Sequence, residues 1–346
     1  MSTVPNSAEH VPSADVDRAS GAVVSVRGLE QRFKMRSGTV HAVSQVSFDI
    51  ARRETLGLVG ESGCGKSTTL KAMMRLSRPE SGEVVVNGVD WLALSDRELR
   101  HCRPQMQMIF QDPIASLNPR RSVGDLVLEP LAIQGRGSRV EHRERSEQAL
   151  TAVGLDPGDV WHRKPHEFSG GQCQRISIAR ALVGNPDVLL CDEVVSALDV
   201  SVQAQILNLL EDLRSSRNLT IAFVSHDLSV VHHVADRIAV MYLGRIVEIA
   251  PSGELYWRPA HPYTAALLAA IPEIDPSRRS RKAVVVRGEP PSPLDPPTGC
   301  RFHPRCPRAV DVCSTEVPVL QEAADGHFVA CFRPLDDGWQ SVDIST

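Results

Sequence analysis

A run of nine residues has the side-chain types and the spacing that bind a polyphosphate. It consists of Gly60, Glu61, Ser62, Gly63, Cys64, Gly65, Lys66, Ser67 and Thr68, which fit the pattern G-x-x-x-x-G-K-[ST]. The glycines let backbone N–H groups turn toward phosphate oxygens, and the start of a following helix adds a positive dipole. Lys66 supplies a charge for the β- and γ-phosphates, and the Ser67 hydroxyl can bind Mg²⁺. A plain glycine-rich turn between a strand and a helix is the weaker interpretation.

Two adjacent acids follow the apolar run 188–191. Asp192 lies at the predicted carboxyl end of a strand, where a carboxylate beside the phosphate loop can hold Mg²⁺ through water. Glu193 faces the other way and could polarise an attacking water. Alone, such a pair usually marks a solvated strand end. The phosphate loop in the same chain favours the catalytic interpretation.

A second glycine cluster consists of Ser169, Gly170, Gly171 and Gln172 and precedes a predicted helix at 173–182. A Ser hydroxyl and bare backbone at a helix N-terminus would form a second anion site. One chain rarely needs two phosphate sites for one nucleotide. We therefore expect each nucleotide to lie between two subunits.

The elements that must position these groups can be predicted from the apolar pattern. Strand-like runs lie at 22–26, 42–50, 55–60, 81–88, 187–192, 219–227, 237–243 and 245–250. Helical patterns lie at 66–76, 92–103, 139–154 and about 200–214. Strand–helix–strand alternation implies parallel pairing, so we predict an α/β core.

Composition and the length of the apolar stretches disfavour several classes of protein. The chain has 346 residues with 38 Lys and Arg against 42 Asp and Glu, a net charge of −4, which disfavours a duplex-DNA binder that relies on bulk charge. Aromatic residues make up only 4%, which disfavours a base-stacking RNA module. No stretch reaches about 18 apolar residues, and the first 20 residues lack the apolar region of a signal peptide. We therefore expect a cytoplasmic protein.

The order of these motifs over residues 23–250 resembles that of the ATP-binding cassette ATPases, the motor subunits of ABC transporters. The resemblance implies an α/β phosphate-loop domain with an antiparallel β edge and a helical subdomain. It implies that segment 60–68 binds ATP and that Phe33 stacks on adenine. It also implies three magnesium ligands, namely Ser67, Gln111 and Asp192.

The same resemblance implies the catalytic groups. They are Glu193, His226, which would contact the γ-phosphate, and Gln111, which would also report to the membrane partner. The signature 169–172 would bind the γ-phosphate held by the opposite subunit, and 196–199 would be the D-loop at the dimer seam. Without the other motifs, Phe33 would be interpreted as a core residue, Gln111 as a surface loop residue and His226 as a histidine at the end of a strand.

One position departs from the family pattern, which usually has Pro after the catalytic Glu. Val194 and Val195 follow Glu193 instead. Proline would fix φ in the turn toward the D-loop, whereas valine loosens the turn without removing a catalytic group. We therefore expect ATPase activity to survive.

The C-terminal part indicates a branch of the family. The 57 residues at 112–168 are too few for a long coiled-coil insertion, and there is a single cassette. The segments HPYTAALL (261–268) and GEPPSP (288–293) resemble the C-terminal extension of oligopeptide/dipeptide and nickel importer ATPases. The proline content of 251–300 predicts an extended linker. We expect a flexible tail at 1–20, an ATP-binding domain at 21–250 with its helical subdomain near 112–178, and an extension at 251–346.

This branch implies an assembly. It would comprise a second, paralogous ABC ATPase as heterodimer partner, two transmembrane permeases and an extracytoplasmic solute-binding protein, without nucleic acid. The chain would lie peripherally on the cytoplasmic face of the cell membrane and power import of di- and oligopeptides. The alternatives are a nickel or other small-solute importer and a soluble, non-transport ABC ATPase.

Four of the eight cysteines crowd into the extension: Cys300, Cys306, Cys313 and Cys331. A cytoplasmic protein rarely forms disulfides, so the crowding points to a metal centre or to free thiols. The spacing is wider than in common zinc sites and misses the ferredoxin patterns, so it does not name the metal. The resemblance to peptide-importer ATPases implies a 4Fe-4S cluster, and zinc is the alternative.

Overall fold

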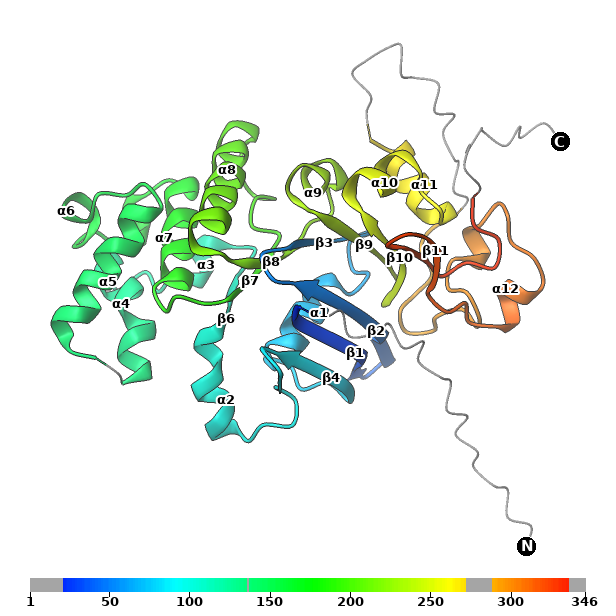
Figure 1. Ribbon diagram of the computed structural model, residues 1–346, viewed down its shortest axis with the longest axis horizontal. Helices are drawn as coiled ribbons and strands as arrows, with labels where there is room; N and C mark the ends of the chain where they lie inside the picture. Colours follow the sequence, from blue (N-terminus) through cyan, green and yellow to red (C-terminus); the bar gives the residue numbers. More distant parts are fainter. Residues whose placement is uncertain (1–20, 136, 272–287, 336–346) are drawn as a thin grey trace, which may run out of the picture.

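The computed structural model describes residues 21–135, 137–271 and 288–335, so the predicted tail at 1–20 lies outside the described residues (Figure 1). The strands are β1 (Ala22–Met35), β2 (Gly38–Ala51), β3 (Thr55–Val59), β4 (Ser81–Val86), β5 (Val89–Asp90), β6 (Met106–Ile109), β7 (Val188–Asp192), β8 (Thr220–Val224), β9 (Arg237–Tyr242), β10 (Arg245–Pro251), β11 (Gln321–Ala324) and β12 (His327–Val329). The helices are α1 (Lys66–Met73), α2 (Asp96–Cys102), α3 (Pro113–Ser116), α4 (Val123–Gln134), α5 (Arg139–Ala152), α6 (Pro157–Val160), α7 (Gly170–Leu182), α8 (Val200–Arg217), α9 (Leu228–Val234), α10 (Ser252–Trp257), α11 (Pro262–Ala269) and α12 (Val312–Thr315).

An eight-stranded mixed sheet runs through the molecule in the order β11-β12-β10-β9-β3-β8-β7-β6. Strands β9, β3, β8, β7 and β6 run parallel to one another, whereas β10 is antiparallel to β9. The parallel part of the sheet confirms the α/β prediction. Strands β3, β7 and β8 are buried along their whole length, as expected for central parallel strands. The register pairs Leu58 with Val224 and Asp192 with Val224, so the carboxyl ends of these three strands share one edge.

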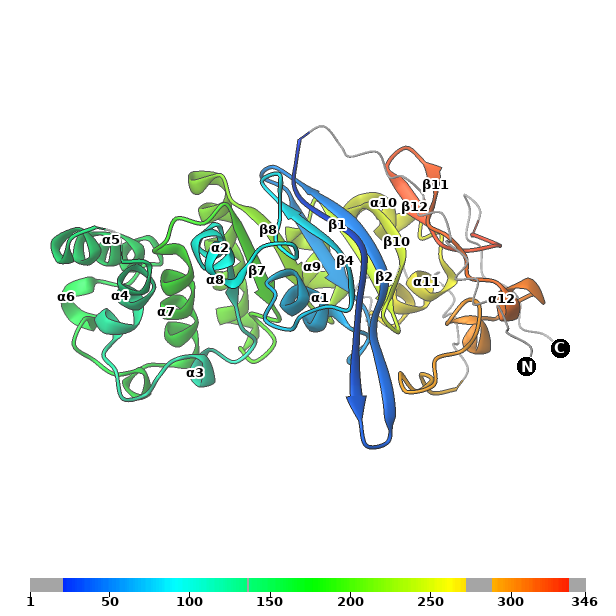
Figure 2. The ribbon, with the colours of Figure 1, turned by 90° about the horizontal axis from the view of Figure 1, so that it is seen from below.

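A second, antiparallel sheet of order β2-β1-β4-β5 provides the predicted antiparallel edge. Its apolar face, α1 and alternate residues of the central strands share one core, in which Trp91 is fully buried. Strands β1 and β2 continue past this core as a long hairpin, which Figure 2 shows projecting from the body of the molecule. Helix α1 ends at Met73, before the predicted residue 76, because Arg75 has a left-handed φ of 50°.

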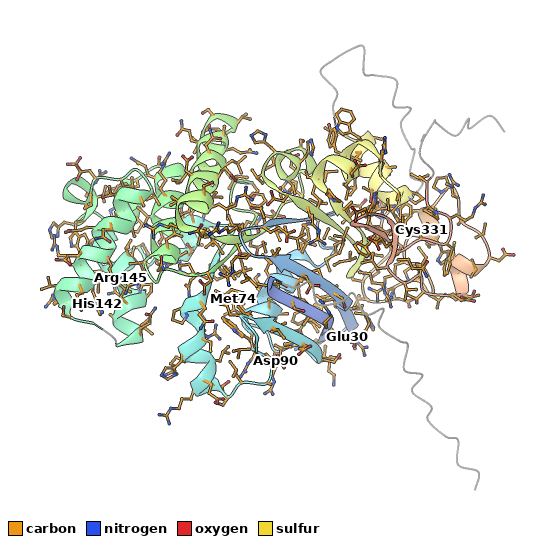
Figure 3. All side chains as sticks on the ribbon, viewed as in Figure 1. Glu30, Met74, Asp90, His142, Arg145 and Cys331 are labelled. Atoms are coloured by element: carbon orange, nitrogen blue, oxygen red, sulfur yellow. The ribbon has the colours of Figure 1, made fainter. Side chains whose placement is uncertain are left out.

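Helices α3 to α7 form a helical subdomain at one end of the molecule (Figures 1 and 2). Its helices begin at side-chain caps such as Ser122 and Ser138. Helix α4 lies against α6 so closely that a Cβ at Gly124 would be 2.2 Å from the Trp161 ring. Figure 3 labels His142 and Arg145 here and Cys331 near the opposite end of the molecule.

The extended linker predicted for 251–300 is wrong for its first part. Its residues 272–287 lie outside the described residues, and 289–297 form neither helix nor strand. Helices α10 and α11 occupy the first part of 251–300, and β12 pairs with β10 so that Ile249 faces Phe328. The fully buried carboxylate of Glu248 ties these parts together. It accepts hydrogen bonds from the backbone N–H groups of Ala260 and His261 at 2.7 and 2.9 Å, and it lies 2.7 Å from His327 Nε2.

Candidate functional site

The predicted phosphate-binding segment, residues 60–68, forms the turn between β3 and α1. Gly60, Gly63 and Gly65 have φ values of 152°, 77° and 110°, which side chains rarely adopt. A Cβ at Gly60 would lie 2.1 Å from the Met241 carbonyl oxygen, and one at Gly65 would lie 2.2 Å from the Ala42 carbonyl oxygen. Glycine is therefore required at these two positions by close backbone approach as well as by φ.

Lys66 is buried at the mouth of this turn. Its ammonium donates hydrogen bonds to the carbonyl oxygens of Gly60 at 2.8 Å and Glu61 at 3.0 Å. Both acceptors are neutral, so the oxygens of a phosphate would be stronger partners for the same ammonium group. The buried Cys64 lies beside it, and burial raises the pKa of the Cys64 thiol.

The next residue, Ser67, contacts one of the other two predicted magnesium ligands. Ser67 Oγ donates a 2.6 Å hydrogen bond to Asp192 Oδ1, which lies at the end of β7. Burial raises the pKa of the Asp192 carboxyl, and the Ser67 hydrogen bond and the charge of Lys71 partly oppose that rise. A hydroxyl and a carboxylate are the oxygen donors that Mg²⁺ prefers, so this pair fits the ion chemically.

Glu193 meets the other two predicted catalytic groups. Gln111 Nε2 donates to Glu193 Oε2 at 2.9 Å, and His226 Nδ1 lies 3.5 Å from the same oxygen. Glu193 has a left-handed φ of 49°, a conformation that costs free energy and often occurs at functional sites. Its backbone N–H donates to the Val224 carbonyl oxygen at 3.0 Å, which fixes the residue against β8.

The glycine-rich signature is placed apart from these groups. Ser169 caps α7, where it and Gln172 exchange hydrogen bonds in a capping box, and both residues are exposed. Among the residues described, no hydrogen bond joins 169–172 to segment 60–68. Phe33 is 40% exposed on the projecting hairpin, opposite Val40, so it is not a core residue. Residues 196–199, the predicted D-loop, lead into α8, whose N-cap is Asp199.

Two residues that contact the phosphate loop were not predicted from the sequence. Tyr263, in α11, accepts a 2.9 Å hydrogen bond at its hydroxyl from the Glu61 backbone N–H. Arg305 Nη1 lies 3.1 Å from both carboxylate oxygens of Glu61. These contacts span separations of 202 and 244 residues along the chain, and no local pattern reveals such pairs.

The four C-terminal cysteines line one cavity together with His261, Phe302 and His303. Burial raises the pKa of the Cys300 and Cys306 thiols, and it raises that of Cys331 to about 11. In the part of the chain that the structure describes, no group of three or more His, Cys, Asp or Glu side chains is arranged to hold a metal ion. The four thiols therefore lie around one cavity, but their arrangement confirms neither a 4Fe-4S cluster nor a zinc site.

Comparison with known proteins defines the class. Residues 43–196 match the family described as "ABC transporter". The solved dimeric post-hydrolysis structure of the ATP-binding cassette MJ0796, bound to ADP and Pi, has a TM-score of 0.61 and 31% identity, covering 66% of this chain and 98% of that one. The chain belongs to the ABC transporter ATPases, for which ATP and Mg²⁺ are the expected ligands.

The comparison also defines the branch, because residues 247–313 match the family described as "Oligopeptide/dipeptide transporter, C-terminal region". A Brucella ovis protein named for peptide import and ATP binding is 53% identical over 311 residues, covering 90% of this chain and 98% of its own length. The oligopeptide transport ATP-binding protein AppF of Bacillus subtilis is 49% identical over 319 residues, covering 89% and 96%. Among the described residues, none of the helices has the length and apolarity needed to cross a bilayer.

Proposed function

We propose that this protein is the ATP-hydrolysing subunit of an importer of di- and oligopeptides, bound peripherally to the cytoplasmic face of the membrane. The observation that carries the proposal is the convergence of three groups at one edge of the parallel sheet. They are the phosphate loop, the Ser67–Asp192 pair, and Glu193 with its neighbours Gln111 and His226. The peptide substrate is supported by the C-terminal match and by the names of the relatives.

We assign the chemistry of hydrolysis as follows. Segment 60–68 binds the phosphates of ATP, and Lys66 exchanges two carbonyl partners for phosphate oxygens. Ser67, Gln111 and Asp192 would hold Mg²⁺, which supplies charge neutralisation at the β- and γ-phosphates. Glu193 orients the attacking water, and Gln111 positions the Glu193 carboxylate. His226 would contact the γ-phosphate, and Phe33 would stack on adenine.

We further propose that the exposed signature 169–172 serves the nucleotide of a paralogous ATPase partner beneath two permeases, fed by an extracytoplasmic solute-binding protein. The support is that the signature and the phosphate loop lie on different subdomains of this chain. Purified alone, the chain should therefore hydrolyse ATP slowly, and addition of the partner ATPase and permeases should accelerate it strongly. A lone chain as fast as the whole complex would refute the heteromeric assembly.

Transport assays test the substrate. Deletion of the gene should abolish uptake of a labelled tripeptide, and the wild-type gene should restore it while a Glu193→Gln gene should not. Normal peptide uptake together with lost nickel uptake would refute the peptide assignment. Normal uptake of both would refute importer function and would favour a non-transport ATPase.

The domain division at residue 250 and the 4Fe-4S cluster also remain proposals. The division is supported by the change from strands to helices after β10, although β12 returns to pair with β10. The cluster is supported by the gathering of four soft thiols around one cavity, whose ligands would be Cys300, Cys306, Cys313 and Cys331. Iron and sulfide analysis after anaerobic purification tests it, and protein with one zinc and no iron would refute it.

A further inference from the structure

Glu61 places a negative charge within the segment that binds polyphosphate. Its own carbonyl oxygen lies 3.0 Å from the Lys66 ammonium, so the residue is next to the main phosphate-binding charge. An uncompensated carboxylate at this position would repel a nucleotide triphosphate and would compete with it for Lys66. The loop therefore needs a means of neutralising Glu61 or directing its side chain away.

Arg305 provides that compensation. Its Nη1 lies 3.1 Å from both Glu61 carboxylate oxygens and 3.3 Å from the Tyr242 hydroxyl. The Arg305 side chain is only 10% exposed and that of Glu61 is 29% exposed, so solvent screens the pair less than a surface ion pair. The backbone N–H of Glu61 is fixed separately by the Tyr263 hydroxyl.

Arg305 lies over a closely packed group of three aromatic rings. The rings of Tyr242, Tyr263 and Phe302 are in mutual contact, with centroid distances of 4.6, 5.3 and 5.4 Å. All three rings are almost completely buried, and they come from β9, α11 and the C-terminal loop. Arg301, on the same loop, donates to the Leu243 carbonyl oxygen and to Ser44 Oγ. The C-terminal extension thus contacts the phosphate loop at Glu61 through Tyr263 and Arg305, and Arg301 attaches it to β2 and to the turn between β9 and β10.

We propose that Arg305 is a positioning residue for ATP binding, which neutralises Glu61 and holds its carboxylate away from the bound phosphates. This inference rests on the proposed ATP site and goes beyond it, because it assigns a role in nucleotide affinity to the C-terminal extension. Arg305 does not contact the reacting atoms, so it should affect ATP affinity and leave the Glu193 chemistry unchanged.

The test compares ATP dissociation constants of the full-length chain. Arg305→Met removes the charge and keeps a side chain of similar length against the Tyr242 ring. It should weaken ATP binding about tenfold, which corresponds to about 1.4 kcal/mol. Arg305→Lys should retain affinity to within about threefold, because it keeps the charge. Arg258→Met, which removes an exposed charge from α10's C-terminal cap in the same extension, is the matched control and should change nothing.

The double variant distinguishes charge neutralisation from simple anchoring. Glu61→Gln in the Arg305→Met background should restore most of the lost affinity, because the repelling charge is gone. The Arg305→Met penalty should also be smaller for ADP than for ATP and should shrink as salt is raised. In the assembled transporter, KM for ATP should rise while kcat stays within about twofold.

Several outcomes would overturn the proposal. They are an unchanged Kd in Arg305→Met, a double variant no better than the single variant, and a penalty equal for ADP and ATP. Wild-type chain that binds no ATP would instead refute the proposed nucleotide site itself, so the two failures are distinguishable. Melting temperatures of all variants, measured alongside, separate lost affinity from lost folding.

Discussion

Replacing single glycines of the phosphate loop with alanine should have unequal effects, although the residues are three positions apart. Gly60→Ala introduces a Cβ 2.1 Å from the Met241 carbonyl oxygen, at a φ of 152°. Gly63→Ala introduces a Cβ with nothing within 4 Å, at a φ of 77°. The second variant is therefore a matched control, because it adds the same methyl group to the same loop without a steric clash.

The magnitudes follow from these contacts. A left-handed conformation costs an alanine about 1–2 kcal/mol, so Gly63→Ala should lower the free energy of unfolding by roughly that amount. Gly60→Ala must also move its methyl or the Met241 carbonyl by about an ångström. Met241 is paired with Ile246 in the β9–β10 ladder, and such overpacking costs a further 1–3 kcal/mol or so. We therefore expect a total loss of roughly 3 kcal/mol or more.

Urea unfolding of the full-length variants, followed by tryptophan fluorescence and by circular dichroism, measures the difference. Gly60→Ala should unfold at a clearly lower urea concentration than Gly63→Ala, and Gly63→Ala should lie slightly below wild type. Equal unfolding midpoints for the two variants would refute the steric argument and would mean that the β9 strand yields easily.

Three further predictions test the site and its support. Glu193→Gln should bind ATP to within about twofold of wild type and lower hydrolysis by the assembled transporter by about 10²- to 10⁴-fold, and near-normal turnover would contradict its role. Lys66→Ala should weaken ATP binding about 10- to 100-fold by removing charge-assisted hydrogen bonds, whereas an unchanged Kd would exclude that contribution. Glu248→Ala should lower the free energy of unfolding by roughly 3 kcal/mol, because two buried backbone N–H groups and His327 lose their acceptor. Glu254→Ala, at an exposed position, is the control, and equal urea midpoints for the two variants would contradict this prediction.

The local parts of the site could be predicted from the sequence because their signals are local. A buried strand, a glycine pattern and a helix are contiguous from 55 to 73. The meeting of Ser67 with Asp192 followed from a rule of topology, since the carboxyl ends of parallel strands share an edge. The local sequence pattern and the order of the strands agree here. The contact between Ser67 and Asp192, 125 positions apart, could therefore be predicted from the sequence.

Proline content predicts extended chain across 251–300, and this is wrong for 251–271, where α10 and α11 lie. Pro251 ends β10 and immediately precedes α10, while Pro262 occupies the first turn of α11. A helix has no partner for its first N–H groups, so proline costs nothing there and its fixed φ suits the turn. His261 completes this start by accepting a hydrogen bond from the Tyr263 N–H at 3.0 Å. The same helix start places Tyr263 against the phosphate loop.

The valines that follow Glu193 show how packing can replace a proline. Val194 and Val195 are 1% and 3% exposed, so both side chains are anchored in the core and do not leave the turn loose. The Glu193 carbonyl oxygen accepts hydrogen bonds from the Ser196 N–H at 3.1 Å and from Ser196 Oγ at 2.9 Å, which close the turn. Burial and two hydrogen bonds thus restrict the backbone where proline would restrict φ alone. The left-handed Glu193 is held from both sides, by β8 before the turn and by Ser196 after it, so the geometry of this turn does not depend on proline at this position.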